Sequence, residues 1–210
     1  MRAASLLCCK ESVKGQYRES DRQMPLPEIL ATETLAQTRF FKIEALDLRF
    51  SNGVERRYER LPSTGIEGVI VVAINAKNEL LLIREYAAGF HELQLTLPKG
   101  VVDTGESLEA AASRELAEEA GFAANHTQVV KRLTLAPGHM GFAINVVFAK
   151  DLYPKRLQGD EPEPPELVTW PIQRLDELLT SDEFCEARAI AALTLCRPLF
   201  AEDSVNKPLN

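Results

Sequence analysis

The hydrophobic and polar residues alternate along much of the first half of the chain, in the pattern expected of β-strands. FFKIEALDLRF and VERRYERL alternate on either side of Ser-Asn-Gly at residues 51–53, a sequence typical of a hairpin turn. IEGVIVVAIN is a continuous apolar run that suits a buried strand, and a turn at residues 76–78 leads into ELLLIREY. The chain from residue 40 to residue 86 is therefore predicted to be rich in strands.

The middle of the chain predicts a helix, and the second half predicts further strands and two more helices. Residues 107–120 contain no Pro or Gly and are rich in Ala, Leu and Glu, with Ser107 as the expected N-cap and Gly121 as the left-handed residue that ends the helix. VVKRLTLA, FAINVVFAKDL and LVTW predict strands. Helices are expected near residues 172–179 and 182–198, the second capped by Ser181 or Asp182. This order predicts a mixed α/β sandwich.

Three glutamates gather on one side of the predicted central helix. Glu115 and Glu119 are one turn apart, and Glu118 lies close to the same face. Neighbouring carboxylates repel each other by about 4 kcal/mol per close pair at an effective dielectric constant near 20, and a hard divalent cation reverses that repulsion. Oxygen ligands suit Mg²⁺ or Mn²⁺, and Arg114 can orient one of the carboxylates by pairing with it or with Glu106. The alternative is that this acidic face is merely solvated surface.

These residues belong to a longer pattern, G-x5-E-x7-R-E-L-x-E-E-x-G-F, which favours the metal-site interpretation because all its positions match together. The pattern consists of Gly100, Glu106, Arg114, Glu115, Leu116, Glu118, Glu119, Gly121 and Phe122. It matches the Nudix box, so the chain resembles the Nudix hydrolases, which cleave a nucleoside diphosphate linked to another group. The resemblance implies an α/β Nudix fold, a mixed β-sheet sandwiched between helices, with an N-terminal antiparallel strand region.

Segments outside the box extend the resemblance from about residue 31 to residue 200. FSNGVERRYER, LLIREYA, DLYP and GDEPEP followed by a Trp-Pro pair are similar to the ADP-ribose pyrophosphatase branch, most of all to ADP compounds hydrolases of the NudE type. Pro137 is a further marker of that branch. The resemblance implies a homodimer that hydrolyses the pyrophosphate bond of ADP-ribose, NADH and diadenosine polyphosphates, releases AMP and depends on Mg²⁺ or Mn²⁺. Two alternatives stay open: a Nudix hydrolase of other nucleoside diphosphate derivatives, and a non-catalytic sensor of an ADP-ribose-type ligand.

The resemblance also implies roles for individual residues of the box and of the acidic loop at residues 159–166. Metal binding falls to Glu115, Glu118, Glu119 and the backbone carbonyl of Lys99, and Glu118 also counts as a catalytic residue. The structural residues of the box are Gly100, Glu106, Arg114 and Gly121. In the acidic loop, Glu161 stands where relatives have the catalytic base and Glu163 where they have an extra metal ligand, so either could accept the proton of the attacking water. The alternative is that the acidic loop is only a solvated surface loop without a catalytic role.

Substrate binding is predicted to involve arginines that precede the box. Arg56 and Arg57 belong to strands that in similar proteins reach across a dimer, and Arg84 ends the strand leading toward the box. Arginine suits bidentate phosphate contacts, although exposed strand arginines more often serve solubility. Three aromatic residues could stack an adenine or could belong to the core: Phe40, Phe41 and Tyr58. Thr96 is a departure, because many relatives have Glu at this position, and no substrate contact is carried over to it.

The length, composition and charge of the chain limit the number of domains and the kinds of partner. With 210 residues, 45% hydrophobic and 26% charged, the chain is long enough for one substantial core, and one Nudix domain is expected over residues 29–200, with its strand region at about 38–62. Residues 1–28 are expected to be disordered, residues 201–210 to form a tail, and Met24 to be the true start. A net charge of −7 argues against binding to nucleic acid.

Cysteine use and hydropathy point to a cytoplasmic protein. The four cysteines show neither a C-x-x-C pair nor zinc-site spacing, so they are interpreted as reduced thiols. The first nine residues are too short an apolar segment for a signal peptide, and no membrane partner is expected. The expected partner is instead a small nucleotide substrate, with a second copy of the chain.

Overall fold

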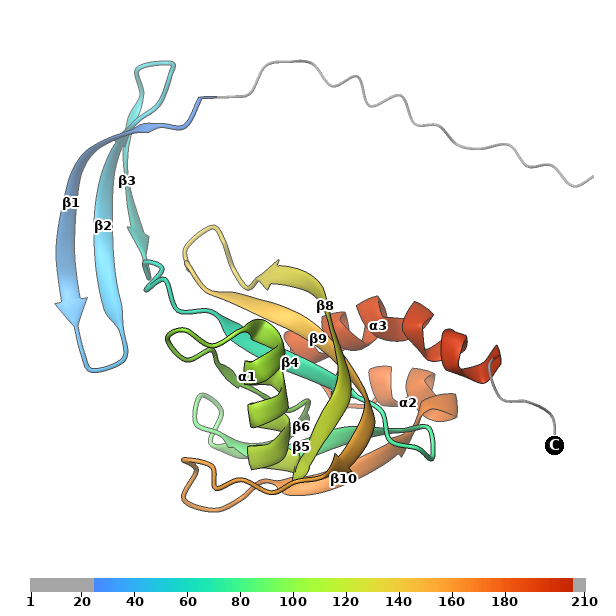
Figure 1. The fold of residues 1–210 in the computed structure, drawn as a ribbon. Coiled ribbons are helices and arrows are strands. Elements are labelled where there is room, and N and C mark those ends of the chain that lie inside the picture. Colours follow the sequence, from blue (N-terminus) through green and yellow to red (C-terminus); the bar gives the residue numbers. More distant parts are fainter. Residues whose placement is uncertain (1–24, 206–210) are drawn as a thin grey trace, which may run out of the picture.

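The computed structural model describes residues 25–205, with side chains described as far as residue 200. An N-terminal antiparallel sheet stands beside a larger α/β body (Figure 1). Its strands are β1 (Glu28–Gln37), β2 (Lys42–Arg49) and β3 (Glu55–Arg60), with β2 in the middle. The predicted hairpin turn is confirmed between β2 and β3, where Gly53 has φ 81° and Asn52 Oδ1 accepts a hydrogen bond from a backbone N–H.

Strand β1 is not predicted by the sequence, because the expected strand region begins only at about residue 38. All ten residues of β1 are exposed, so no buried face imposes a strict alternation of apolar and polar residues. Two register shifts against β2 disturb the alternation further. The strand is held by its ladder to β2, which the sequence of β1 alone does not reveal.

The aromatic residues of the N-terminal sheet do not belong to the core. Phe40 and Phe41, in the connection between β1 and β2, are 77% and 63% exposed, and Tyr58 is 46% exposed. The interpretation of these residues as core is therefore wrong.

The N-terminal sheet joins the body through the segment that follows β3. The Leu61 N–H donates to the carbonyl of His139 (2.9 Å), and the Leu61 carbonyl accepts from Gly141 N–H (2.8 Å). A Cβ added to Gly141 would lie 2.3 Å from the backbone nitrogen of Ser63. The absence of a side chain at Gly141 therefore permits the two segments to pack this closely.

The body contains a four-stranded mixed sheet in the order β7-β4-β9-β8. The strand β4 (Gly68–Ala73) runs parallel to β9 (Ala143–Pro154) and antiparallel to β7 (Lys99–Val101). The strand β8 (Phe122–Thr134) pairs with the other edge of β9. Every residue of β4 is buried, which confirms the buried strand predicted from its continuous apolar run.

A second sheet of the body is antiparallel, in the order β10-β5-β6. It consists of β5 (Glu79–Ala87), β6 (Glu92–Thr96) and β10 (Glu166–Pro171). The register places Glu166, at the end of the acidic loop, opposite Arg84. The acidic loop therefore leads directly into this sheet.

Helices cover both sides of the sheets (Figure 1). The helix α1 (Leu108–Glu115) continues into a π-helical turn, η1 (Leu116–Ala120). Near the C-terminus, the 3-10 turn η2 (Ile172–Arg174) leads into α2 (Leu175–Leu179), and α3 (Ala187–Val205) follows. We call α1 and η1 together the box helix.

The strand β4 connects the two core layers. Val69 and Val71 pack in a cluster with Leu116 of the box helix, whereas Ile70 and Val72 pack in a second cluster with residues of α2 and α3. Successive side chains of a strand point to opposite faces, so one strand contributes to both clusters. The predicted mixed sheet between helices is confirmed.

The last helix begins later than the sequence suggested. Helix α3 starts at Ala187, so the prediction that Ser181 or Asp182 caps it is wrong. The carboxylate of Glu186 accepts hydrogen bonds from two backbone N–H groups of the first turn (3.0 and 3.2 Å) and takes the capping role instead. Ser181 accepts a backbone N–H within a turn before the helix.

The predicted start at Met24 lies outside the described residues, as do residues 1–24 of the predicted disordered segment 1–28 and residues 206–210 of the predicted tail. Within the described part, Glu28 already belongs to β1, and α3 extends to Val205 inside the predicted tail. Among the helices between residues 25 and 205, none combines the length and the apolar character required to span a bilayer.

Candidate active site

The box helix begins and ends at the predicted residues. The Ser107 hydroxyl accepts a hydrogen bond from Ala110 N–H (3.2 Å), as an N-cap does. Gly121 closes the helix with φ 77°, and its N–H donates to the carbonyl of Leu116, five residues earlier. That last bond makes the final turn π-helical rather than α-helical. The wider turn changes the directions of Glu118 and Glu119 from those of a regular α-helix.

Arg114 organises the acidic side of the box helix, as the sequence suggested. Its guanidinium donates to Glu106 (2.9 and 3.2 Å), to Glu115 (2.7 Å) and to Glu118 (3.1 Å). A further N–H donates to the Val101 carbonyl (2.7 Å). The guanidinium holds the pKa of Glu106 below its usual range, and Glu106 in turn raises the pKa of Arg114. Arg114 therefore fixes three carboxylates with one rigid donor group.

Glu115 is buried beside the first glycine of the box. A Cβ on Gly100 would lie 2.1 Å from the carboxylate of Glu115, so this carboxylate occupies the space that a side chain at residue 100 would need. Burial raises the pKa of Glu115 despite the Arg114 pair, and the negative charges of Glu118 and Asp160 add to the rise. The site therefore holds negative charge that Arg114 does not fully compensate.

Glu119 points away from Arg114 toward the start of β7. Its Oε2 accepts the backbone N–H of Lys99 (2.8 Å), and the Lys99 ammonium pairs with Glu85. Burial is the main cause that raises the pKa of Glu119 to about 8, and the nearby charges of Glu85 and Glu115 contribute to that rise. An ionised carboxylate here lacks a compensating charge. A divalent cation at this position would supply it.

The donor chemistry fits a hard divalent cation, but the carboxylates are held by other partners. Within the described residues, no three His, Cys, Asp or Glu side chains converge as a ready set of metal ligands. Arg114 holds Glu115 and Glu118, and the Lys99 backbone holds Glu119. Metal binding therefore requires these side chains to exchange part of their present contacts for the ion.

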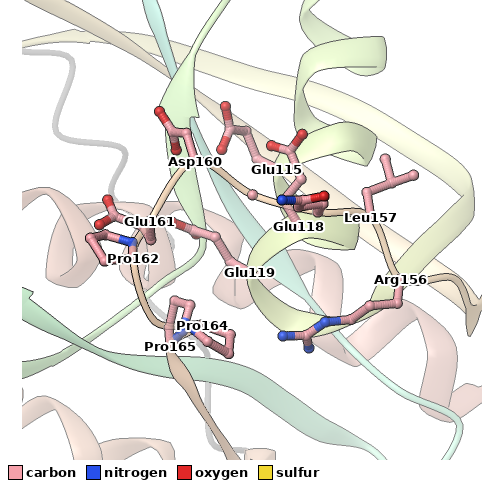
Figure 2. A pocket seen from close by; sticks show the side chains of 12 residues that line it. Glu115, Glu118, Glu119, Arg156, Leu157, Asp160, Glu161, Pro162, Pro164 and Pro165 are labelled. Carbon is pink, nitrogen blue, oxygen red and sulfur yellow. The ribbon is translucent and has the colours of Figure 1, made fainter.

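The acidic loop forms a wall of the same site. A pocket of about 470 Å³ is lined by Glu115, Glu118 and Glu119 on one side and by Asp160 and Glu161 on the other (Figure 2). The remaining lining residues come from the loop and the segment before it: Arg156, Leu157, Gln158, Gly159, Pro162, Pro164 and Pro165. The loop and the box helix therefore present their carboxylates to one space, as the catalytic interpretation of the loop requires.

The two candidate bases differ in position. Glu161 lines the pocket with the glutamates of the box helix, whereas Glu163 is not among the lining residues. The segment before the loop is bonded to the end of the helix, because Lys155 N–H donates to the Gly121 carbonyl and Leu157 N–H to the Ala117 carbonyl (3.1 Å each). These hydrogen bonds fix the position of the start of the acidic loop relative to the end of the box helix.

The three predicted substrate arginines lie apart from the pocket within one chain. Arg84 pairs with Glu166 (3.3 Å) and Glu183 (3.4 Å), whereas the next residue of β5, Glu85, faces Lys99. Arg57 pairs with Glu33 and Asp47 inside the N-terminal sheet, and Arg56 donates to the Glu55 carbonyl (2.8 Å). Figure 1 shows that sheet projecting beside the body rather than covering the box helix.

Four further residues were not predicted from the sequence to have a catalytic, metal-binding or substrate-binding role. Glu85 and Asp160 contribute charge beside Glu119 and Glu115, and Arg156 lines the pocket. Thr96 is almost fully buried, and its hydroxyl is the one buried side-chain N or O atom without a hydrogen-bond partner among the described residues. The segment LLIREYA contains Glu85 and DLYP ends two residues before Arg156, but only the folded chain shows which side chains turn toward the pocket.

Comparisons with known proteins agree with this geometry. The sequence matches the NudE-type Nudix hydrolase N-terminal domain over residues 27–60 and the NUDIX domain over residues 66–193. It is 47% identical over 176 residues to ADP compounds hydrolase NudE of Escherichia coli K12, covering 84% of this chain and 94% of that protein. It is 23% identical over 171 residues to an ADP-ribose pyrophosphatase of Bacillus subtilis 168, covering 78% and 91%. A crystal structure of an ADP compounds hydrolase superposes with a TM-score of 0.83 at 45% identity, covering 87% of this chain and 98% of that one.

Proposed function

The chain belongs to the Nudix family and is a Nudix pyrophosphatase, and from this premise we propose that it hydrolyses ADP-ribose, NADH and diadenosine polyphosphates with release of AMP. One observation carries the proposal: the glutamates of the box helix and Glu161 of the acidic loop line one pocket. The similarity to an ADP compounds hydrolase over most of the chain supports this choice of substrates.

The metal of the reaction is Mg²⁺, or Mn²⁺ in its place. The ligands are Glu115, Glu118, Glu119 and the backbone carbonyl of Lys99, which offer oxygen atoms only. When bound, the cation neutralises the charge of the pyrophosphate and lowers the pKa of a bound water. Because burial already raises the pKa of Glu119 to about 8, ligation of a cation is coupled to loss of a proton from this residue.

Glu161 is the general base that we favour. It faces the glutamates of the box helix across the pocket, whereas Glu163 does not line the pocket. Glu161 accepts a proton from the attacking water as the water oxygen bonds to phosphorus, and the bridging P–O bond breaks on the opposite side. Arg114 keeps Glu115 and Glu118 in place through this step.

The N-terminal sheet fits a role in a cytoplasmic homodimer. Its apolar side chains include Ile29 (56% exposed) and Leu35 (41% exposed), and every residue of β1 is exposed. Uncovered apolar residues on an edge strand are typical of an interface. In the homodimer, Arg56 and Arg57 of one copy would reach the substrate of the other, because within one copy they lie apart from the pocket. Arg84 would need to leave Glu166 and Glu183 to contact substrate.

A hydrolysis panel tests the proposal. ADP-ribose, NADH and diadenosine polyphosphates are incubated with Mg²⁺ or Mn²⁺ beside sugar nucleotides and oxidised nucleoside triphosphates, and products are identified by chromatography. We expect AMP from the ADP-linked compounds. Turnover confined to the other nucleotides, or binding of ADP-ribose without turnover in either metal, contradicts the proposal.

A further inference from the structure

Arg156 is the one basic side chain that lines the pocket among its described residues, and the proposed chemistry does not use it. Five carboxylates share the pocket with it: Glu115, Glu118, Glu119, Asp160 and Glu161. Despite these neighbours, Arg156 forms no hydrogen bond or ion pair with any residue of the described chain, whereas every N–H-bearing nitrogen of the Arg114 guanidinium is engaged. The five N–H donors of Arg156 are therefore available to a ligand.

The backbone at Arg156 is held on both sides. Lys155 N–H donates to the carbonyl of Gly121, and Leu157 N–H donates to the carbonyl of Ala117, each at 3.1 Å. Both acceptors belong to the last turn of the box helix or to its closing residue. The direction in which the Arg156 side chain leaves the backbone is therefore tied to the helix that carries the predicted metal ligands, although the side chain itself is exposed.

Gly121 leaves room for the Arg156 side chain. A Cβ on Gly121 would come within 3.2 Å of Arg156 Nη1 and 3.4 Å of Cδ. Glycine at this position thus serves both the left-handed helix end and the passage of the arginine across it. Figure 2 shows the guanidinium extending past the helix end toward Pro164 and Pro165, across the pocket from the carboxylates of Glu115 and Asp160.

We propose that Arg156 is a specificity-determining residue that binds a phosphate of the substrate beyond the pyrophosphate group under attack. This inference rests on the proposed function, because that function places the attacked phosphate at the glutamates of the box helix. A longer phosphate chain then extends across the pocket toward the guanidinium, which suits a bidentate contact with phosphate oxygens. Arg156 therefore favours diadenosine polyphosphates over ADP-ribose, whose two phosphates end in an uncharged ribose.

A purely structural role makes a different prediction. A cation near the C-terminal end of a helix interacts favourably with the helix dipole, and in a purely structural role Arg156 acts only on stability. Loss of such a contact lowers the melting temperature and leaves the preference among substrates unchanged. The two roles are therefore separated by comparing substrates of different phosphate-chain length.

The test uses Arg156→Ala and Arg156→Lys, with Lys155→Ala as the matched control. Lys155 is the neighbouring exposed cation, and it is not among the residues that line the pocket. For each protein, kcat and KM are measured with ADP-ribose and with diadenosine pentaphosphate, and the melting temperature is recorded.

We expect Arg156→Ala to raise KM for diadenosine pentaphosphate about tenfold more than KM for ADP-ribose, since a charged hydrogen bond contributes at least that factor. The kcat values and the melting temperature should stay close to those of the wild type. Arg156→Lys should recover part of the preference, because it keeps the charge without the bidentate geometry. Lys155→Ala should change neither ratio.

A binding measurement provides a readout besides turnover. In the Glu119→Gln background, which is expected to turn over too slowly to consume the ligand, the dissociation constant of diadenosine pentaphosphate should rise about tenfold on adding Arg156→Ala. Equal losses for both substrates, a fall in kcat alone, or a lower melting temperature with unchanged preference would overturn the role of Arg156. Absence of AMP release by the wild-type protein would instead overturn the proposed function.

Discussion

The box helix and the N-terminal sheet differ in whether their charged and apolar groups find partners within the chain. In the box helix, Arg114 bonds three carboxylates, and buried Glu115 packs against Gly100. In the N-terminal sheet, arginines such as Arg57 pair only with acidic residues of the same sheet, and apolar residues of β1 stay exposed. The carboxylates of the box helix are thus held by groups of the same chain, whereas the apolar residues of β1 stay uncovered, as in one half of an interface.

The difference suggests that the catalytic groups and the substrate-binding arginines lie in different parts of the molecule. The glutamates proposed for metal binding and proton transfer line one pocket of a single chain. The arginines proposed for substrate binding on β3 are not, since they belong to the sheet that stands beside the body. We therefore propose that, in a homodimer, each copy supplies the chemistry of its own site and the recognition sheet of its partner's site.

The largest effect is expected from neutralising a predicted metal ligand. Glu119→Gln should lower kcat by about 10³-fold, because cation binding contributes several kcal/mol and each 1.36 kcal/mol is tenfold in rate. The matched control is Glu109→Gln, the same change at an exposed position in the first turn of the helix, which should keep wild-type kcat. The kcat of each variant is measured from steady-state rates at saturating Mg²⁺. Wild-type turnover by folded Glu119→Gln would show that Glu119 has no role in the mechanism.

The next effect distinguishes the two candidate bases of the acidic loop, Glu161 and Glu163. Glu161→Gln should lower kcat by about 100-fold, in line with the loss of a general base, whereas Glu163→Gln should stay within about threefold. Both proteins carry the same chemical change two residues apart, so each is the control of the other. The reverse order of losses would assign the base to Glu163 and show that the loop moves when substrate binds.

The smallest effect concerns the exposed strand of the N-terminal sheet. Ile29→Lys with Leu35→Lys should convert a dimer into a monomer of 23.4 kDa, as measured by light scattering, and raise KM about tenfold with little change in kcat. Thr32→Lys with Thr34→Lys adds the same charge to the same exposed strand and should leave the dimer intact. A monomeric wild-type protein, or a lysine variant that still dimerises through this sheet, would remove the strand from the interface.

The sequence was most informative where local spacing determines structure. The Ser107 cap, the Gly121 helix end and the pairing of Arg114 with Glu106 all follow from residues within one helix or one turn of it. The resemblance to the Nudix family is confirmed by the matching domains and by the similarity to an ADP compounds hydrolase. These features depend on contacts between residues close in sequence or on a motif with many matching positions.

Features that depend on tertiary contacts could not be predicted. The π-helical turn changes where Glu118 and Glu119 point, and no residue of the box signals it. The ion pair of Arg84 with Glu166 was not predicted, because adjacent residues of a strand face opposite sides and only the folded chain shows that Glu85 is the one that meets Lys99. The strand β1 shows no buried face and therefore no clear alternation.

Mixing two impaired variants tests whether two copies of the chain share their sites. Glu119→Gln lacks the predicted metal ligand, and Arg56→Ala with Arg57→Ala lacks the recognition arginines. When the two proteins are co-refolded in equal amounts, half of the dimers are mixed, and one of the two sites in each mixed dimer combines an intact Glu119 with intact arginines from the partner. We expect AMP release from ADP-ribose to recover to roughly a quarter of the wild-type rate in the mixture. No recovery beyond the sum of the separate variants, with mixed dimers demonstrated by mass, would contradict the sharing of sites between copies.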